Sequence, residues 1–279
     1  MDWTVFQHQY LQNAIMAGLC AGIACSTVGV FVVTMHLSFL GICIAHAAFA
    51  GALMGVWLGF SPVLGALAFS LGSAALIGPL SDRGELSPDA AIGIVFSLML
   101  GLAFLFLGLT PGSRTAALNL LWGRILTVSR QDLVLLAITT VALLALLVLC
   151  FKEIQAVLCH RRVALAVGIP ATAVFYGMLF ASGVVMTVSL PGIGGLLVYC
   201  LVLNPAAAAF QLTYSLKRMF VLAAVFGVLS CWAGLAASYL WDLMAGACII
   251  LASTAIFALA TVFSPKRTAN SWQRPRTAK

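Results

Sequence analysis

Long apolar runs, separated by short polar or basic stretches, are the main pattern of this chain. A helix needs about 20 apolar residues to cross a bilayer, and the runs lack the period-two alternation of a membrane β-strand. The pattern therefore predicts an all-α, polytopic helical membrane protein with about nine transmembrane helices, one of them short or broken, and it disfavours a β-barrel. The predicted spans are 14–34, 41–58, 62–78, 90–109, 133–151, 170–188, 192–204, 219–240 and 243–263.

The seventh run, 192–204, is too short to cross a bilayer alone. It follows a Pro-Gly-Ile-Gly-Gly sequence and ends at Asn204-Pro205, a pattern typical of a broken or re-entrant helix. Residues 204–218 then predict a short cytoplasmic helix, because Asn204 suits its cap, Pro205 its first turn, and four alanines follow.

Composition narrows the class of protein. The 279-residue chain is 63% hydrophobic and only 8% charged, whereas soluble domains are about one-quarter charged, so a soluble fold is excluded. The net charge of +7 comes mostly from loops and the C-terminal tail, which indicates membrane topology rather than a nucleic-acid partner. We expect a transmembrane domain over residues 1–264, surrounded by lipid, and a basic tail over 265–279.

The distribution of lysine and arginine predicts the orientation, because cytoplasmic loops collect basic residues. A cytoplasmic C-terminus and an outer N-terminus place eleven basic residues inside and three outside. The three outer arginines share one segment, 110–132, in which we expect a short helix near 116–125. Aromatic residues near the predicted outer helix ends fit an interfacial belt: Trp57, Phe60, Tyr239 and Trp241.

The segment 38–55 combines small residues with an ionisable side chain. Gly51 and Gly55 form a G-x-x-x-G step that lets helices approach closely in lipid. His46 lies deep within a predicted span, so we expect it to face protein or water rather than acyl chains. Neutral imidazole is a common metal ligand, and Cys43 lies three residues earlier on the same helix face. The alternative is a histidine hydrogen-bonded within the bundle beside a buried cysteine.

Several stretches carry a recognisable order of motifs along residues 28–262. They are Gly29-Val30-Phe31-Val32-Val33 with Leu37-Ser38-Phe39-Leu40-Gly41 and Ala45-His46-Ala47, then residues 89–96, residues 121–129, Pro191-Gly192-Ile193-Gly194-Gly195-Leu196-Leu197 with Asn204-Pro205 and four alanines, and Asp242. This ordered set resembles the membrane permease subunit of the zinc/manganese/iron ABC importer family.

The resemblance implies a permease that moves a divalent transition-metal ion across the bacterial cytoplasmic (inner) membrane. Its partners would be a second permease copy, a cytoplasmic ABC ATPase dimer and an extracytoplasmic metal-binding solute-binding protein. The chain has no G-x-x-x-x-G-K-S/T motif, so ATP would bind to the separate ATPase subunit. We therefore expect a transport subunit without an enzyme site or a permanently bound cofactor.

The resemblance also implies roles for individual residues. His46 and Cys43 would contact the metal ion on the translocation path, and residues 204–218 would form the coupling helix that docks on the ATPase. Arg124 and Asp242 would lie at an outer gate or entry; the alternative for Asp242 is that it caps the last helix. The implied coupling residues are Asn204, Pro205, Ala206, Ala207, Tyr214, Lys217 and Arg218.

The chain departs from the family pattern at three places. Ile42 replaces an aspartate four residues before the histidine, Met35-His36 replaces an arginine pair, and Arg124 stands where the family often has Asn or Asp. Loss of the carboxylate removes an oxygen ligand, and a thiolate–imidazole pair would favour zinc over manganese. A permease for a metal chelate of the siderophore or cobalamin type, and a stand-alone secondary carrier or channel, therefore stay open as alternatives.

Overall fold

The structure is a computed structural model, and it describes residues 9–83, 87–109 and 128–266. These residues form ten α-helices and no β-strand, and nine of the helices are long and apolar enough to cross a membrane. The predictions of an all-α fold and about nine spans are confirmed. The helices are α1 (Gln9–Thr34), α2 (Leu40–Leu58), α3 (Pro62–Arg83), α4 (Pro88–Leu109), α6 (Arg130–Leu149), α7 (Phe151–Ala166), α8 (Ala171–Ile193), α9 (Gly195–Leu212), α10 (Leu216–Trp241) and α11 (Ala245–Val262).

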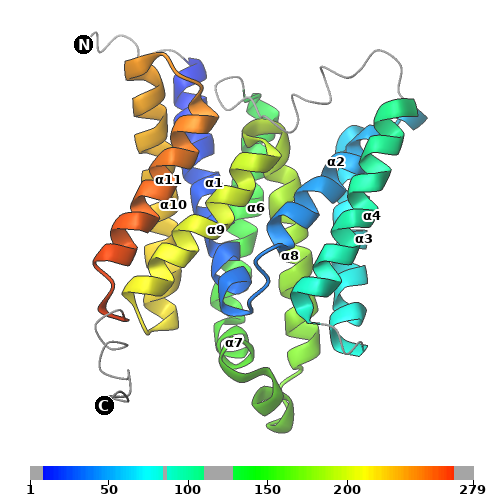
Figure 1. Cartoon of the computed structure of the whole chain (residues 1–279), viewed down its shortest axis with the longest axis vertical. Helices are drawn as coiled ribbons and strands as arrows, with labels where there is room; N and C mark the ends of the chain where they lie inside the picture. Colours follow the sequence, from blue (N-terminus) through cyan, green and yellow to red (C-terminus); the bar gives the residue numbers. More distant parts are fainter. Residues whose placement is uncertain (1–8, 84–86, 110–127, 267–279) are drawn as a thin grey trace, which may run out of the picture.

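The nine long helices alternate in direction, so α1 begins at one end of the molecule and α11 finishes at the other (Figure 1). The shorter α7 lies beyond the ends of its neighbours α6 and α8, at the end where α11 finishes. We call this the basic end, because at least five lysines and arginines with described side chains belong to its elements: Lys152, Arg161, Lys217, Arg218 and Lys266.

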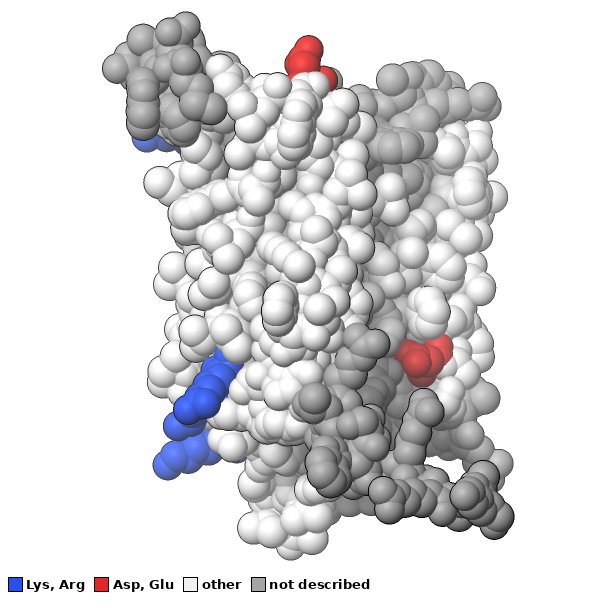
Figure 2. Space-filling model, turned by 60° about the vertical axis from the view of Figure 1, so that its left-hand side comes forward, with Lys and Arg blue, Asp and Glu red and all other residues white. Residues whose placement is uncertain are grey.

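Charged side chains leave the middle of the molecule free. Figure 2 shows a broad uncharged band between the blue and red side chains that lie toward the two ends. A band of this kind suits the hydrocarbon core of a bilayer, where an unpaired charge is costly. The orientation of the chain, with the basic end in the cytoplasm, stays a prediction from the basic residues.

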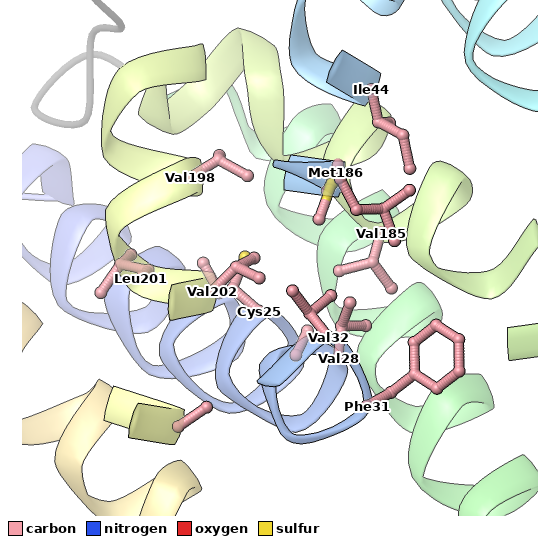
Figure 3. Close-up of a cluster of buried hydrophobic side chains, with 14 of the residues drawn as sticks. Cys25, Val28, Phe31, Val32, Ile44, Val185, Met186, Val198, Leu201 and Val202 are labelled. Carbon is pink, nitrogen blue, oxygen red and sulfur yellow. The ribbon is translucent and has the colours of Figure 1, made fainter. Parts of the chain in front are cut away.

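The core forms around α1, which packs against α6, α8, α9 and α10. Val28 and Val32 of α1, Met186 of α8 and Val202 of α9 belong to one buried apolar cluster (Figure 3). Ile44 of α2 joins the same cluster. In lipid such contacts stabilise the bundle through close packing rather than through the hydrophobic effect.

Helices α2 and α3 approach each other through glycines. A Cβ added at Gly51 would overlap the carbonyl group of Gly65, and a Cβ at Gly65 would overlap the carbonyl of Gly51. Gly55 meets the backbone of Pro62 one turn further along. The close packing predicted for the G-x-x-x-G step is confirmed, and it fixes the helix that carries His46.

The seventh span differs from the prediction. Helix α9 runs for 18 residues, through Asn204 and Pro205 to Leu212, so the predicted break and the separate short helix over 204–218 are wrong. Proline lacks the N–H that would bond the carbonyl of Leu201. The Ser26 hydroxyl of α1 donates to the carbonyl of Gly22 over 2.5 Å, and its oxygen lies 3.5 Å from that of Leu201. A polar group of a neighbouring helix thus lies beside the carbonyl that proline leaves free, an arrangement that suits proline inside a membrane helix.

Candidate functional site

His46 lies in the first half of α2 and is half-buried. Its Nδ1 is 2.9 Å from the carbonyl oxygen of Ile42, and because a carbonyl oxygen can only accept, Nδ1 is the nitrogen that carries the proton. In this tautomer Nε2 carries the lone pair with which a histidine binds a metal ion. Phe96 of α4 contacts the ring in a T-shaped arrangement with centroids 5.2 Å apart. The imidazole is thus held in one orientation by its own helix and by α4.

Cys43 does not accompany His46 toward a shared space. Its side chain is fully buried and belongs to the main apolar core. Within the described ranges, no group of three or more His, Cys, Asp or Glu side chains could hold a metal ion. Among the described residues, His46 is therefore a candidate ligand outside any larger ligand cluster.

Asn204 lies in the middle of α9, eight residues before the helix ends, and it does not cap a helix. Its Nδ2 donates to the Thr254 hydroxyl of α11 over 3.2 Å, and that hydroxyl donates to the carbonyl of Ile250 over 2.9 Å. Eight residues of α-helix correspond to about 12 Å, so this carboxamide lies well inside the span.

Of the other predicted coupling residues, some are buried in the helix bundle and others are exposed at its surface. Pro205 and Ala206 are buried within the bundle, and Ala207 is half-buried. The exposed members belong to the basic end, in the α9–α10 turn and the first turn of α10: Tyr214, Lys217 and Arg218.

Lys266 joins this turn to the residues that follow α11. Its ammonium group donates to the carbonyl of Phe210, and lies 3.8 Å from the Phe210 ring centroid and 4.9 Å from the Tyr214 ring centroid. Burial lowers the pKa of Lys266, because desolvation disfavours the charged form. The end of α9 and the end of α11 are therefore held together at the basic end.

Helix α7 is connected to the core by aromatic and cationic contacts. It bends at His160, where φ is −154° and ψ is 90°. The Arg161 guanidinium lies 4.4 Å from the ring centroid of Phe175 in α8, and that ring lies 5.8 Å from the Phe31 ring of α1. A displacement of α7 would therefore act directly on two helices of the core.

The start of α7 is connected to α10 in a similar way. The rings of Phe151 and Phe220 lie 6.2 Å apart, and the Lys217 ammonium lies 5.6 Å from the Phe151 centroid. Beyond the bend, α7 and the residue after it expose three large apolar side chains: Val163, Leu165 and Val167. The sequence contained a signal for this surface, since residues 163–167 read Val-Ala-Leu-Ala-Val between two predicted spans.

The two residues predicted at the outer gate have different outcomes. Arg124, like the short helix expected near 116–125, lies outside the described residues. Asp242 is exposed at the end opposite α7, but it does not cap the last helix. It ends α10 in a left-handed conformation with φ of 50°, and its backbone N–H donates to the carbonyl of Ser238. Met244 holds the cap position of α11 and makes no side-chain hydrogen bond there, so capping by Asp242 was wrong.

The order of these helices agrees with a known group of transport proteins. Residues 7–264 match the ABC 3 transport family, which covers nearly the whole chain. The chain belongs to the ABC 3 transport family. This membership agrees with the resemblance in its motifs.

Relatives extend along most of the chain. The manganese transport system membrane protein MntC of Halalkalibacterium halodurans is 31% identical over 263 residues, which cover 94% of this chain and 90% of that protein. The manganese import system permease protein ScaB of Streptococcus parasanguinis is 28% identical over 264 residues, covering 95% and 94% of the two chains.

Solved structures support the same fold. A chain of PsaBC from Streptococcus pneumoniae, in complex with Fab, superposes with a TM-score of 0.85 at 28% identity and covers 96% of this chain and 97% of that chain. A metal-chelate type ABC transporter in an inward-facing conformation gives a TM-score of 0.71 at 16% identity, with 90% and 85% covered. The second likeness shows the fold alone.

Proposed function

We propose that this ABC 3 family chain is the permease subunit of an importer that moves a divalent transition-metal ion, with manganese as the first candidate, across the bacterial cytoplasmic membrane. The observation that carries the proposal is His46, whose Nδ1 bonds to the Ile42 carbonyl so that Nε2 is left for a ligand, within a span of a chain whose relatives are named manganese permeases. Family membership favours this function over the stand-alone carrier or channel that the sequence left open.

The cargo proposal agrees with the donor atoms near His46. A reactive thiolate beside the imidazole would favour zinc, but Cys43 is buried in the apolar core, away from any such pairing. Because the described residues hold no cluster of three or more metal-binding side chains around His46, we infer that a second permease copy completes the site at the interface of a homodimer. A few weak ligands suit transport, since an ion must leave its site as readily as it enters.

Energy would come from a cytoplasmic ATPase dimer, and a solute-binding protein would deliver the metal ion on the opposite side. We place the ATPase contact on α7 and on the exposed members of the predicted coupling set, Tyr214, Lys217 and Arg218. The apolar side chains after the bend of α7 suit a protein groove, and the contact from Arg161 through Phe175 to Phe31 would transmit its movement.

Metal-stimulated ATP hydrolysis tests this function. The chain would be co-purified with its ATPase, reconstituted in lipid with the solute-binding protein, and assayed with Mn²⁺, Zn²⁺ and Fe²⁺. We expect Mn²⁺ to stimulate hydrolysis and His46→Ala to abolish the stimulation. His36→Asn is the matched control, because His36 is exposed between α1 and α2 at φ of 56°, a conformation that asparagine tolerates. Failure of any ATPase to associate would contradict the importer, and stimulation only by a metal chelate would contradict a free ion.

A further inference from the structure

Strongly polar side chains are rare inside the spans of this protein. More than five residues from either end of the described spans, only His46 and Asn204 carry a charge, an imidazole or a carboxamide. A polar residue at such depth is costly unless it faces protein or water. The position of Asn204 therefore needs an explanation separate from that of His46.

Asn204 belongs to a face of α9 that the rest of the chain only half covers. We call this face the α9 stripe; from Cys200 onward its members recur every three to four residues, as one side of a helix requires, and Tyr199 lies at its edge. Each of them is half-buried, and four carry a polar atom. The stripe consists of Tyr199, Cys200, Asn204, Ala207 and Gln211.

The α9 stripe differs from a surface built for lipid. On α6, the uncovered side chains at mid-span are apolar and more exposed, such as Ile138 at 63% and Val141 at 67%. Within the described residues, Asn204 has one hydrogen bond, from Nδ2 to Thr254, which leaves its carbonyl oxygen unused. Acyl chains offer no donor to such an oxygen, whereas water or a cation satisfies it.

The α9 stripe lies between α2 and α11. The Tyr199 ring packs against Gly41 of α2, and Asn204 bonds to Thr254 of α11; α9 is flanked by these two helices in Figure 1. Because α2 runs away from the basic end, His46 lies further from that end than Gly41 does, while the α9 stripe continues from Tyr199 toward it.

We propose that the α9 stripe is the inner wall of an aqueous ion path between this chain and a second copy, and that the Asn204 carbonyl and the Thr254 hydroxyl receive the ion after His46. The proposal rests on the proposed function, and it adds the part of the ion path that lies between His46 and the basic end. It supplies the oxygen donors that α2 lacks, since Ile42 occupies the position one turn before His46. Oxygen donors suit manganese.

Reaction with a cationic methanethiosulfonate reagent tests whether the α9 stripe is wet. The complex would be placed in lipid nanodiscs, with single cysteines in a background lacking the eight native ones: Cys200 restored, Asn204→Cys, or Ile138→Cys as the lipid-facing control. Because the reagent attacks a thiolate and thiolates form in water, we expect Cys200 and Asn204→Cys to react about 10-fold or more faster than Ile138→Cys. Mn²⁺ should slow both reactions.

Equal, slow rates at all three positions would overturn the proposal. If the cysteine-free background does not fold, the wild-type complex gives the same test by mass spectrometry: Cys200 should be modified well before the buried Cys231, and equal protection of the two would contradict a wet stripe. Metal-stimulated hydrolysis by the same samples separates the two proposals. A fast reaction without stimulation would refute the cargo, whereas stimulation without the rate difference would refute the path.

Transport variants test the oxygen donor. Asn204→Asp keeps a carbonyl oxygen and adds charge, while Asn204→Leu keeps the approximate volume without a donor atom. We expect Asn204→Leu to raise the KM for Mn²⁺ about 10-fold and Asn204→Asp to keep transport. An unchanged KM in Asn204→Leu would remove Asn204 from the path.

Discussion

The side chains of His46 and Asn204 are both oriented by contacts with neighbouring groups, but these contacts come from different parts of the chain. The carbonyl of Ile42, in the same helix, determines which ring nitrogen of His46 carries a proton, and Phe96 of α4 orients the ring. Asn204 has its orientation set by Thr254 on another helix, and its depth depends on α9 continuing through Pro205. The first site is local to α2, whereas the second exists only because three helices, α1, α9 and α11, come together.

The packing of α2 offers the strongest way to break the first site. Gly51→Val would force a branched side chain into the Gly65 backbone, so we expect a loss of about 3 kcal/mol in unfolding free energy, as for severe overpacking. Gly101→Ala is the matched control, because a Cβ there meets nothing within 4 Å. Denaturation of the purified protein in lipid-like detergent measures both. Equal stability of the two variants would show that α2 and α3 do not need this approach.

The coupling surface gives a smaller, separable effect. Leu165→Asp places a charge on the exposed apolar part of α7, and we expect about 10-fold weaker ATPase binding with an unchanged unfolding temperature, because this side chain lies outside the core. Pull-down of the ATPase at several concentrations measures the affinity. Leu243→Asp is the matched control, because Leu243 is an exposed leucine between α10 and α11 at the end opposite α7. Equal weakening by the two variants would contradict docking on α7.

The support of α9 at Pro205 gives the smallest effect. Ser26→Ala removes the hydroxyl that lies beside the Leu201 carbonyl, and we expect a loss of about 1 kcal/mol, typical of one buried hydrogen bond. Ser97→Ala, which removes an exposed hydroxyl bonded within its own helix, should change stability less. Thermal unfolding of the two variants measures the difference. A larger loss of unfolding free energy in Ser97→Ala would contradict the role of the Ser26 hydroxyl beside Pro205.

The sequence predicted the features that depend on local pattern. Apolar length was enough for nine spans, and the G-x-x-x-G step was enough for the contact of α2 with α3. The role of His46 at the metal path stays a prediction. The ordered motifs were enough for the family.

The features that the sequence did not predict depend on distant residues. Asn204-Pro205 looked like a helix end because the hydroxyl beside the interrupted helix is that of Ser26, far away in the chain. Asp242 was predicted to cap α11 because aspartate is a common N-cap residue. The left-handed backbone conformation with which it ends α10 cannot be predicted from the residue type. Helix α7 is not among the predicted helices, because its apolar stretch is too short for a span and the helix contacts Phe175 and Phe220 of other helices.

Mn²⁺ uptake by proteoliposomes that contain the complete importer tests the central claim most directly. Wild type, His46→Ala, Asn204→Leu and the lipid-facing control Ile138→Leu would be compared with ATP on the ATPase side. We expect ATP-dependent uptake in wild type and Ile138→Leu, a reduced rate in Asn204→Leu and none above background in His46→Ala. Wild-type uptake by His46→Ala would contradict the claim that the metal ion passes this histidine.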